Sequence, residues 1–357
     1  MVSSGHGQGG TRRVTLTEVA RRAGVSRSAA SFALNGRTDL RISEETSARV
    51  RLAAEELGYS PNTTAKTLRT GKSGTVALIS DFIGTTSFAN AMVRGALQTL
   101  RAANTLLYTV DTQGDPEVEA KLLQNLLDRD VDGFLYASMF TRHVDLPPLT
   151  RNAPLVLLNC VSSDVAAVIP DERAAGETAA SVLLDAGHRD AIWFVGSFPP
   201  GFTGAAVWNG WSPLALTERL DGIETMLRKA GTALAGTMPI ETDWDVENGR
   251  AAVARGLGAG RVPTALICAN DALAVGAYHA LSDAGLRVPH DVSVIGFDGS
   301  PLTQAVLPRL TSVALPYEEL GRIAAEMLLQ DARPSPPVRV PMPLVRGASI
   351  SAPAPLG

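Results

Sequence analysis

The segment from Val14 to Leu68 constrains this chain more than any other part of the sequence. It reads VTLTEVARRAGVSRSAASFALNGRTDLRISEETSARVRLAAEELGYSPNTTAKTL. Two short helical patterns flank a Gly-Val turn, and a third helical pattern follows. Two helices joined by a tight turn, with a third as support, form the helix-turn-helix that places one helix in the DNA major groove. We therefore expect residues 14–60 to form an all-α DNA-binding domain, preceded by a flexible tail at residues 1–13.

Local signals mark where these helices begin. Thr15 is expected to cap the first helix, with Glu18 three residues later to complete a capping box. Gly24 supplies the permissive backbone that a tight turn needs. Ser26 and Ser43 are expected to cap the second and third helices through their hydroxyl groups.

The N-terminal part of the second helix is the part that such a motif presents to base edges. Arg27 can donate two hydrogen bonds to a guanine, whereas Phe32 can contact only thymine methyl groups or sugars. The alternatives are a phosphate contact for Arg27 and a packing role for Phe32. Other polar residues of the domain are suited to phosphate contacts, which set register. The DNA-contacting residues expected in this domain are Thr15, Leu16, Ser26, Arg27, Ser28, Ser31, Phe32, Asn35 and Tyr59.

A hinge is expected over residues 61–73. Asn62 follows Pro61 and can cap a short helix that ends at Leu68. A helix this short is not stable alone in water, so it should form only against a twin and DNA. Ala65 permits the close approach, and Leu68 is placed to wedge between base pairs. The hinge residues expected to contact DNA are Asn62, Ala65, Leu68 and Arg69.

The charges are unevenly distributed along the chain. Residues 1–72 hold 12 Lys and Arg against 6 Asp and Glu, whereas the remainder holds 20 against 30. A basic head on an acidic body is expected when only the head meets a polyanion.

The motifs VTLTEVARRAGVS, ALNG, ISEET, AAEELGYSPN and AKTLRTGKSGT resemble the headpiece and hinge of the LacI/GalR family of bacterial repressors. The resemblance implies a homodimeric transcriptional regulator, most simply a repressor of carbohydrate-use genes, bound to pseudo-palindromic operator DNA. In that family the second helix reads the major groove and the hinge leucine intercalates, roles that fall here on Arg27, Ser28 and Leu68. Phe32 stands where the family usually has arginine, so the operator preference is expected to differ.

After Thr75, strand-like runs alternate with helical ones, which predicts parallel sheets covered on both faces by helices. Two such sets follow one another, an arrangement that resembles the two-subdomain, periplasmic-binding-protein-like core of the same family. The fold class expected is therefore α/β, with an all-α headpiece. The expected subdomains are residues 74–171 with 316–332, and residues 172–315 with 333–357.

Ligands of open α/β sheets bind beyond the carboxyl ends of the strands. The polar residues at those ends are Ser80, Asp81, Asn159, Asn270, Asp271 and Asp298. The family resemblance adds Phe88 and Trp244 as aromatic walls and Arg219 as a group that grips hydroxyls, so a sugar-like effector is implied. Each has an alternative: strand-end Asp and Asn often cap the next helix, and Arg219 can pair with Glu218 or Glu224. His188 is expected to be a packing residue of its loop.

Two features of the core also depart from the family pattern. The segment Gly196–Ser212 is longer than usual and rich in aromatic residues, which is typical of a lid or a partner surface. Asn159 stands where several relatives carry aspartate. Both favour an effector that is larger or less polar than a simple sugar.

The sequence contains no enzyme signature. The GKS of RTGKSGT has Lys66 where a phosphate-binding loop needs glycine, and GxSxG, HExxH and paired CxxC motifs are absent. No metal and no cofactor are expected. Cys160 and Cys268 lie in apolar runs and are expected to be reduced thiols; with no secretion signal, this favours the cytoplasm. The alternatives are an effector-independent DNA-binding dimer and a solute-binding protein for a transporter.

Overall fold

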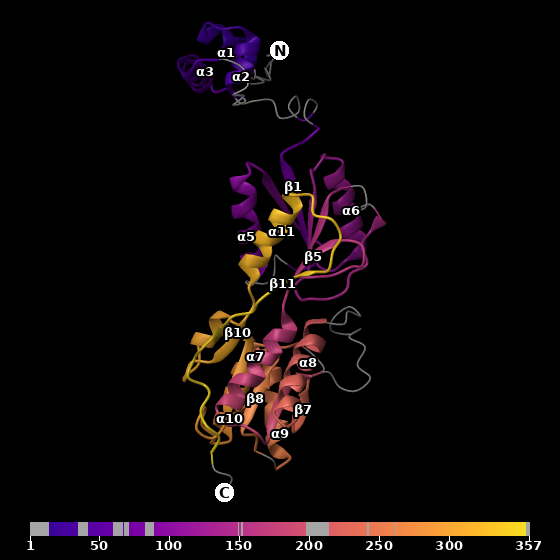
Figure 1. Cartoon of the computed structure of the whole chain (residues 1–357), viewed down its shortest axis with the longest axis vertical. Coiled ribbons are helices and arrows are strands. Elements are labelled where there is room, and N and C mark those ends of the chain that lie inside the picture. Colours follow the sequence, from indigo (N-terminus) through magenta and orange to yellow (C-terminus); the bar gives the residue numbers. More distant parts are fainter. Residues whose placement is uncertain are drawn as a thin grey trace, which may run out of the picture. The chain divides into compact units, whose positions relative to one another are not determined.

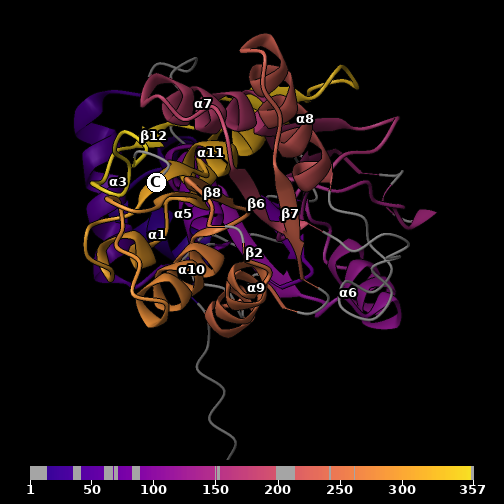
Figure 2. The same cartoon turned by 90° about the horizontal axis from the view of Figure 1, so that it is seen from below.

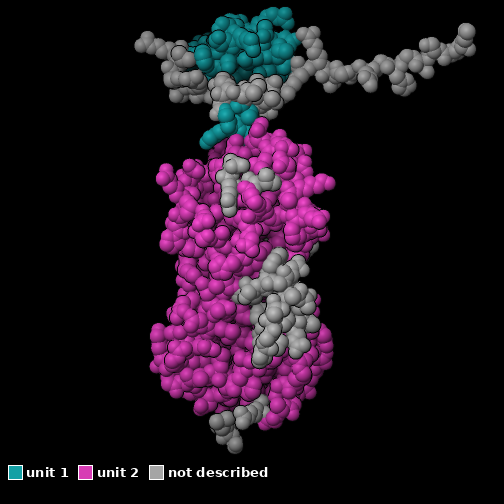
Figure 3. Space-filling view, turned by 90° about the vertical axis from the view of Figure 1, so that its right-hand side faces the viewer, with its two compact units in different colours: residues 1–73 teal, residues 74–357 magenta. Residues whose placement is uncertain are grey.

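The computed structural model describes residues 14–34, 42–59, 67, 71–82, 89–148, 150, 153–197, 214–240, 243–260 and 262–354. The chain divides into two compact units, residues 1–73 and residues 74–357, which are coloured separately in Figure 3. We refer to them as the headpiece and the core.

The described part of the headpiece is all-α, as predicted. Its helices are α1 (Leu16–Ala23), α2 (Arg27–Leu34) and α3 (Glu44–Glu56). They enclose a small core made of alanine and valine side chains, because small residues let short helices approach closely. The buried members of this core are Val19, Ala20, Ala23, Ala30, Val50, Ala53 and Ala54.

The first sheet of the core is entirely parallel, with the strand order β11-β5-β4-β3-β1-β2. Its strands are β1 (Thr75–Ser80), β2 (Leu106–Asp111), β3 (Phe134–Ala137), β4 (Leu155–Leu158), β5 (Ala166–Pro170) and β11 (Val338–Val340). Helices α5 (Ala89–Ala102) and α11 (Tyr317–Leu329) cover one face, and α6 (Pro116–Leu127) covers the other (Figure 1).

The second sheet repeats this arrangement, with the order β12-β10-β9-β8-β6-β7. Its strands are β6 (Ile192–Ser197), β7 (Gly236–Pro239), β8 (Ala265–Cys268), β9 (Ser293–Asp298), β10 (Thr311–Ala314) and β12 (Leu344–Val345). Only β12, at the edge, is antiparallel to its neighbour among these strands. Figure 2 shows two helices on each face: α7 (Glu172–Asp185) and α8 (Leu214–Lys229) on one, α9 (Val246–Gly258) and α10 (Asp271–Asp283) on the other. The α/β class with two helix-covered sheets is confirmed.

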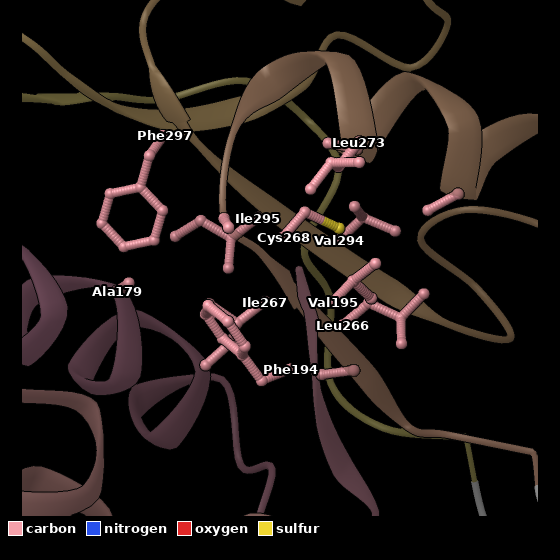
Figure 4. Close-up of a cluster of buried hydrophobic side chains, with 14 of the residues drawn as sticks. Ala179, Phe194, Val195, Leu266, Ile267, Cys268, Leu273, Val294, Ile295 and Phe297 are labelled. Atoms are coloured by element: carbon pink, nitrogen blue, oxygen red, sulfur yellow. The ribbon is translucent and has the colours of Figure 1, made fainter. Parts of the chain in front are cut away.

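The interior of the second half is filled by the apolar runs that predicted its strands. Phe194 and Ile267 come from adjacent central strands and Phe297 from the next one, and all three are fully buried (Figure 4). Continuous rather than alternating apolar runs are expected in a parallel sheet, because helices cover both of its faces.

The chain passes between the two halves three times. It leaves the first sheet after β5 to form α7, returns after β10 to form α11, and leaves again between β11 and β12. The predicted boundary at residue 333 is therefore wrong, because Val338–Val340 pairs in parallel with β5 and belongs to the first half. The second half resumes only after Val340.

Glycines hold three helix pairs of the core in close contact. A methyl group built on any of these glycines would overlap backbone atoms of the neighbouring helix. The pairs are Gly95 and Gly321 between α5 and α11, Gly176 and Gly222 between α7 and α8, and Gly249 and Gly276 between α9 and α10. The absent side chain is what allows each pair its short separation.

Candidate functional sites

The first helix of the headpiece begins with the predicted capping box. Thr15 Oγ1 accepts a hydrogen bond from the Glu18 amide at 3.4 Å, and Glu18 Oε2 accepts one from the Thr15 amide at 2.8 Å. Gly24 ends the helix with a φ of 66°, and its amide donates to Ala20 and Arg21 carbonyls. The turn that separates the two helices thus forms from local sequence alone.

The residues at the start of α2 are exposed, and the helix is anchored by a buried residue further along it. Ser26 Oγ accepts from the Ala29 amide at 3.1 Å, which places the cap as predicted. Ser26, Arg27 and Ser28 are exposed, whereas Ala30, about one turn further along the helix, is fully buried. This first turn is therefore fixed in place by packing and still open to a macromolecular ligand.

The other predicted DNA contacts fall into three groups. Thr15 is exposed, and Ser31 and Phe32 are half-buried on α2. Leu16 and Tyr59 pack against the headpiece core, so they position the helices. The remaining predictions lie outside the described residues, as does most of the aromatic loop; they are Asn35, Asn62, Ala65, Leu68 and Arg69, together with Phe88 of the core.

In the first half of the core, Asp81 lies next to the point where the strand order reverses between β1 and β3. Its Oδ2 accepts a hydrogen bond from Ser138 Oγ at 2.7 Å and lies 3.3 Å from Arg142 Nη2. Its Oδ1 accepts from the Met139 amide at 2.9 Å. Both Asp81 and Arg142 are buried. Sequence reasoning found the aspartate but missed the arginine, which lies 61 residues away in the sequence.

A cavity of about 560 Å³ opens beside this ion pair. Its polar lining includes Asp81, Glu119, Tyr136, Arg142 and His143. The Tyr136 hydroxyl donates to Glu119 Oε2 at 2.9 Å, and burial raises the pKa of the Glu119 carboxyl. A pocket with acidic, basic and phenolic groups at the carboxyl ends of strands is suited to a polar ligand.

Two other predicted residues of this half have structural partners. Asn159 Oδ1 accepts from Thr141 Oγ1 at 2.7 Å, and its Nδ2 donates to the Ser138 carbonyl at 3.0 Å. Ser80 is buried, and its hydroxyl donates to Asp81 Oδ1 at 3.3 Å. Ser80 therefore contacts Asp81 directly, and Asn159 binds the backbone of Ser138, whose hydroxyl donates to Asp81.

In the second half, Arg219 is held by a partner that the sequence did not indicate. Its Nε and Nη2 lie 2.8 and 2.7 Å from Glu172 Oε2. Its Nη1 donates to the carbonyl of Ala269 at the end of β8, and its guanidinium lies 4.2 Å from the centre of the Phe297 ring. The alternative pairing with Glu218 is wrong, because Glu218 binds Arg339 at 2.7 Å.

Carboxylates surround this arginine. Asp271 is fully buried and accepts hydrogen bonds from the Ser300 amide and Ser312 Oγ, both at 2.7 Å; burial raises its pKa to about 6. The pKa of the half-buried Asp298 is raised well above its usual range by removal from water and then by Asp271. Arg219 acts against both shifts.

The first half of the core adds one residue to these carboxylates and Arg219. It is Tyr317, the first residue of α11. Its pKa is raised by desolvation and then by Asp298 and Glu172. Glu172 and Tyr317 each follow a crossover between the two halves, so the group lies where the chain passes from one to the other. We call Glu172, Arg219, Asp271, Asp298 and Tyr317 the crossover cluster.

The remaining predicted effector residues lie close together. Asn270 Oδ1 caps α10 through the Leu273 amide at 2.8 Å, so the helix-cap alternative applies to it. Its Nδ2 also donates to the carbonyl of Trp244 at 3.0 Å, which fixes the segment that carries the tryptophan. The same alternative applies to Asp171, which caps α7 through the Ala174 amide.

The two halves of the core also contact each other near β11. Arg339 of β11 forms a bidentate ion pair with Glu218 of α8. Its Nη1 and Nη2 each lie 2.7 Å from a carboxylate oxygen of the glutamate. The Ala215 amide donates to the Thr141 carbonyl at 3.2 Å. A cavity of about 640 Å³ lies here between the halves, lined by residues of both, including His143, Leu214 and Pro336.

His188 packs in its loop, as predicted. Its Nδ1 lies 3.1 Å from Thr264 Oγ1, its Nε2 lies 3.0 Å from the Ser351 carbonyl, and burial lowers its pKa.

Because the pKa of His188 is lower in the folded protein, its imidazole binds a proton more readily in the unfolded chain. The free energy of unfolding should therefore fall as the pH drops below about 6.5. His188→Gln should flatten this slope, as measured by chemical denaturation of both proteins at several pH values. Equal slopes in the two proteins would contradict this assignment.

Cys160 and Cys268 are both buried, free thiols. Over the described ranges, no three His, Cys, Asp or Glu side chains gather as a metal site. None of the helices in those ranges is both long and apolar enough to cross a membrane.

Comparisons with known proteins agree on both units. Residues 15–62 match the lacI family of bacterial regulatory proteins, and residues 180–350 match a periplasmic binding protein-like domain. The chain is 30% identical over 320 residues to catabolite control protein A of Priestia megaterium, covering 88% of this chain and 91% of that protein. It is 31% identical over 342 residues to the sucrose operon repressor of Escherichia coli, covering 93% and 98%.

Solved structures show the same fold. The lac repressor dimer bound to operator and the anti-inducer ONPF matches with a TM-score of 0.77 at 23% identity, covering 96% of this chain and all of that one. The complex of the transcriptional regulator CelR with cellobiose matches with a TM-score of 0.62 at 27% identity, covering 94% and 100%.

Proposed function

Since this chain is a member of the lacI family of bacterial regulatory proteins, we propose that it is a repressor whose headpiece binds operator DNA and whose core binds a sugar-like effector. The family resemblance inferred from the headpiece motifs is thus confirmed. The observation that carries the DNA-binding part is the exposed first turn of α2, held on a buried alanine face. A relative named as the sucrose operon repressor and a neighbour bound to cellobiose support a carbohydrate effector.

We propose that two chains bind one pseudo-palindromic operator. The lac repressor neighbour is a dimer on its operator, and residues 61–73 of this chain have the composition of a hinge that folds when paired. The effector then changes operator affinity through its different affinity for two arrangements of the core, typically about 1–3 kcal/mol of coupling. We place this protein in the cytoplasm with its operator and assign it binding rather than catalysis.

The test is selection of DNA by the full chain from a random-sequence pool, followed by titration of the selected site with and without sugars. An enriched inverted repeat supports the proposal, and a sugar that changes its affinity supports the effector. Binding with no sequence preference would contradict the repressor function. A selected operator that no sugar affects would instead favour the effector-independent dimer.

Arg27→Ala is expected to weaken binding to the selected operator by roughly 1–3 kcal/mol per half-site, because one bidentate base contact is lost from each half-site. The variant should also accept more bases at one position of each half-site. Fluorescence anisotropy with operators varied at single positions measures both effects.

Arg228→Ala is the matched control, since it removes one exposed positive charge from α8 of the core. Its operator affinity should equal that of the unmodified protein. If Arg27→Ala lowers affinity equally for every sequence and reduces the salt dependence, Arg27 contacts phosphate instead.

A further inference from the structure

The positive charge of Arg219 is already neutralised within the protein. Two of its nitrogens bind a single oxygen of Glu172, the third binds the Ala269 carbonyl, and the guanidinium plane lies against Phe297. The arginine is 5% exposed and the glutamate 1%. A guanidinium locked in this way contributes shape and hydrogen-bond donors to a ligand but little net attraction for a negative charge.

The surroundings of this pair are acidic. Asp271 and Asp298 add two carboxyl groups, and Arg219 is the basic group whose field reaches them as well as Glu172. The crossover cluster therefore holds three carboxyl groups against one basic group, and the pKa values of all three carboxyls are raised, chiefly because burial disfavours their ionised forms. Burial weakens solvent screening, so a further negative charge on a ligand beside Asp298 would be disfavoured as well.

We infer that Glu172 is a specificity-determining residue that makes the effector site reject anions, so that the effector is an uncharged or amine-bearing polyol rather than a sugar acid or sugar phosphate. This inference rests on the proposed function of the core. Hydroxyl and ammonium groups donate hydrogen bonds to carboxylates, which is the chemistry that Asp298 offers. A carboxylate or phosphate on the ligand would meet these acidic groups, and among the described residues of the crossover cluster no unneutralised cation offsets them.

The test uses the full chain and matched probes that differ mainly in charge. They are D-glucose, D-glucosamine, D-glucuronate and D-glucose 6-phosphate, with D-ribose and D-ribose 5-phosphate as a second series. Binding is measured by thermal shift and by isothermal calorimetry. In the unmodified protein, none of the three anions should bind more tightly than its uncharged parent, and an anion that does so overturns the inference.

Glu172→Gln is the decisive variant, because it removes the neutralising charge and keeps the shape of the side chain. Its affinity for inorganic phosphate and for glucuronate should rise roughly tenfold to a hundredfold, as expected for a new hydrogen bond between charged groups. The double variant Glu172→Gln with Arg219→Gln is the matched control and should show no such gain. A folded Glu172→Gln protein that binds anions no better than the unmodified chain overturns the inference.

If Glu172→Gln unfolds the core, inorganic phosphate should restore its cooperative melting by pairing with the released arginine. Absence of rescue contradicts the inference. These outcomes do not depend on operator binding, and the gain of anion binding does not require that the natural effector be in the panel. Failure of the proposed function is therefore distinguishable from failure of the charge-selection inference.

Discussion

Replacing Arg219 with leucine is expected to lower the free energy of unfolding of the core by about 3–5 kcal/mol, because it leaves the Glu172 carboxylate buried without its cation. The glutamate, the first residue of α7, is only 1% exposed. The same substitution also removes the donor to the Ala269 carbonyl and the contact with the Phe297 ring. A loss of effector response in any Arg219 variant must therefore be separated from a loss of stability.

Tryptophan fluorescence during urea denaturation measures this effect selectively. All four tryptophans lie beyond residue 190, so the signal reports on the core and not on the headpiece. The matched control replaces both partners, Glu172→Leu with Arg219→Met, and should be nearly as stable as the unmodified protein, since no buried charge remains. If the single variant loses less than about 1 kcal/mol, the pair is better solvated than its burial indicates.

Gly222→Ala is expected to destabilise the core by about 3 kcal/mol, because the added methyl group would overlap the carbonyl oxygen of Arg173 on α7. Backbone atoms cannot rotate away, so α7 and α8 must separate. Glu172 and Arg219 lie on these same two helices. The substitution should therefore also loosen the ion pair, although it touches neither residue directly.

Gly258→Ala is the control for this experiment. It is also a helical glycine, at the end of α9, but a methyl group there meets no atom within 4 Å. Its effect should be neutral or stabilising by up to about 1 kcal/mol, because alanine favours the helix. Thermal melting followed by tryptophan fluorescence compares the two variants. Similar melting temperatures for both would contradict the close packing of α7 on α8.

The sequence predicted interactions between residues that are close together in the chain, and it missed interactions between residues that are far apart in the chain. The capping box of Thr15 and Glu18 was predictable because both partners lie in one turn. The strand-end position of Asp81 was predictable from the apolar run before it. Arg219 was matched by resemblance, but its partner Glu172 lies 47 residues away, and no local pattern connects the two. The nearby Glu218 was the plausible partner in sequence, yet it faces Arg339 in the fold.

The sequence did not predict the short edge strand β11. β11 has only three residues, and two of them are exposed, so it carries little hydrophobic signal. Its pairing with β5 depends on the return of the chain from α11, which is a tertiary effect. The DNA-contacting set remains a prediction, since base contacts depend on a partner as well as on the chain.

The three crossovers have a consequence for how the protein is made. A ribosome delivers residues in order, and domains that are contiguous in sequence can fold as they emerge. Here β11 reaches the first sheet only after the other strands of that sheet and most of the second have been synthesised. Until then β5 presents an unpaired edge, which is a template for association with other chains. The first sheet of the core is therefore completed late in synthesis, after most of the second sheet.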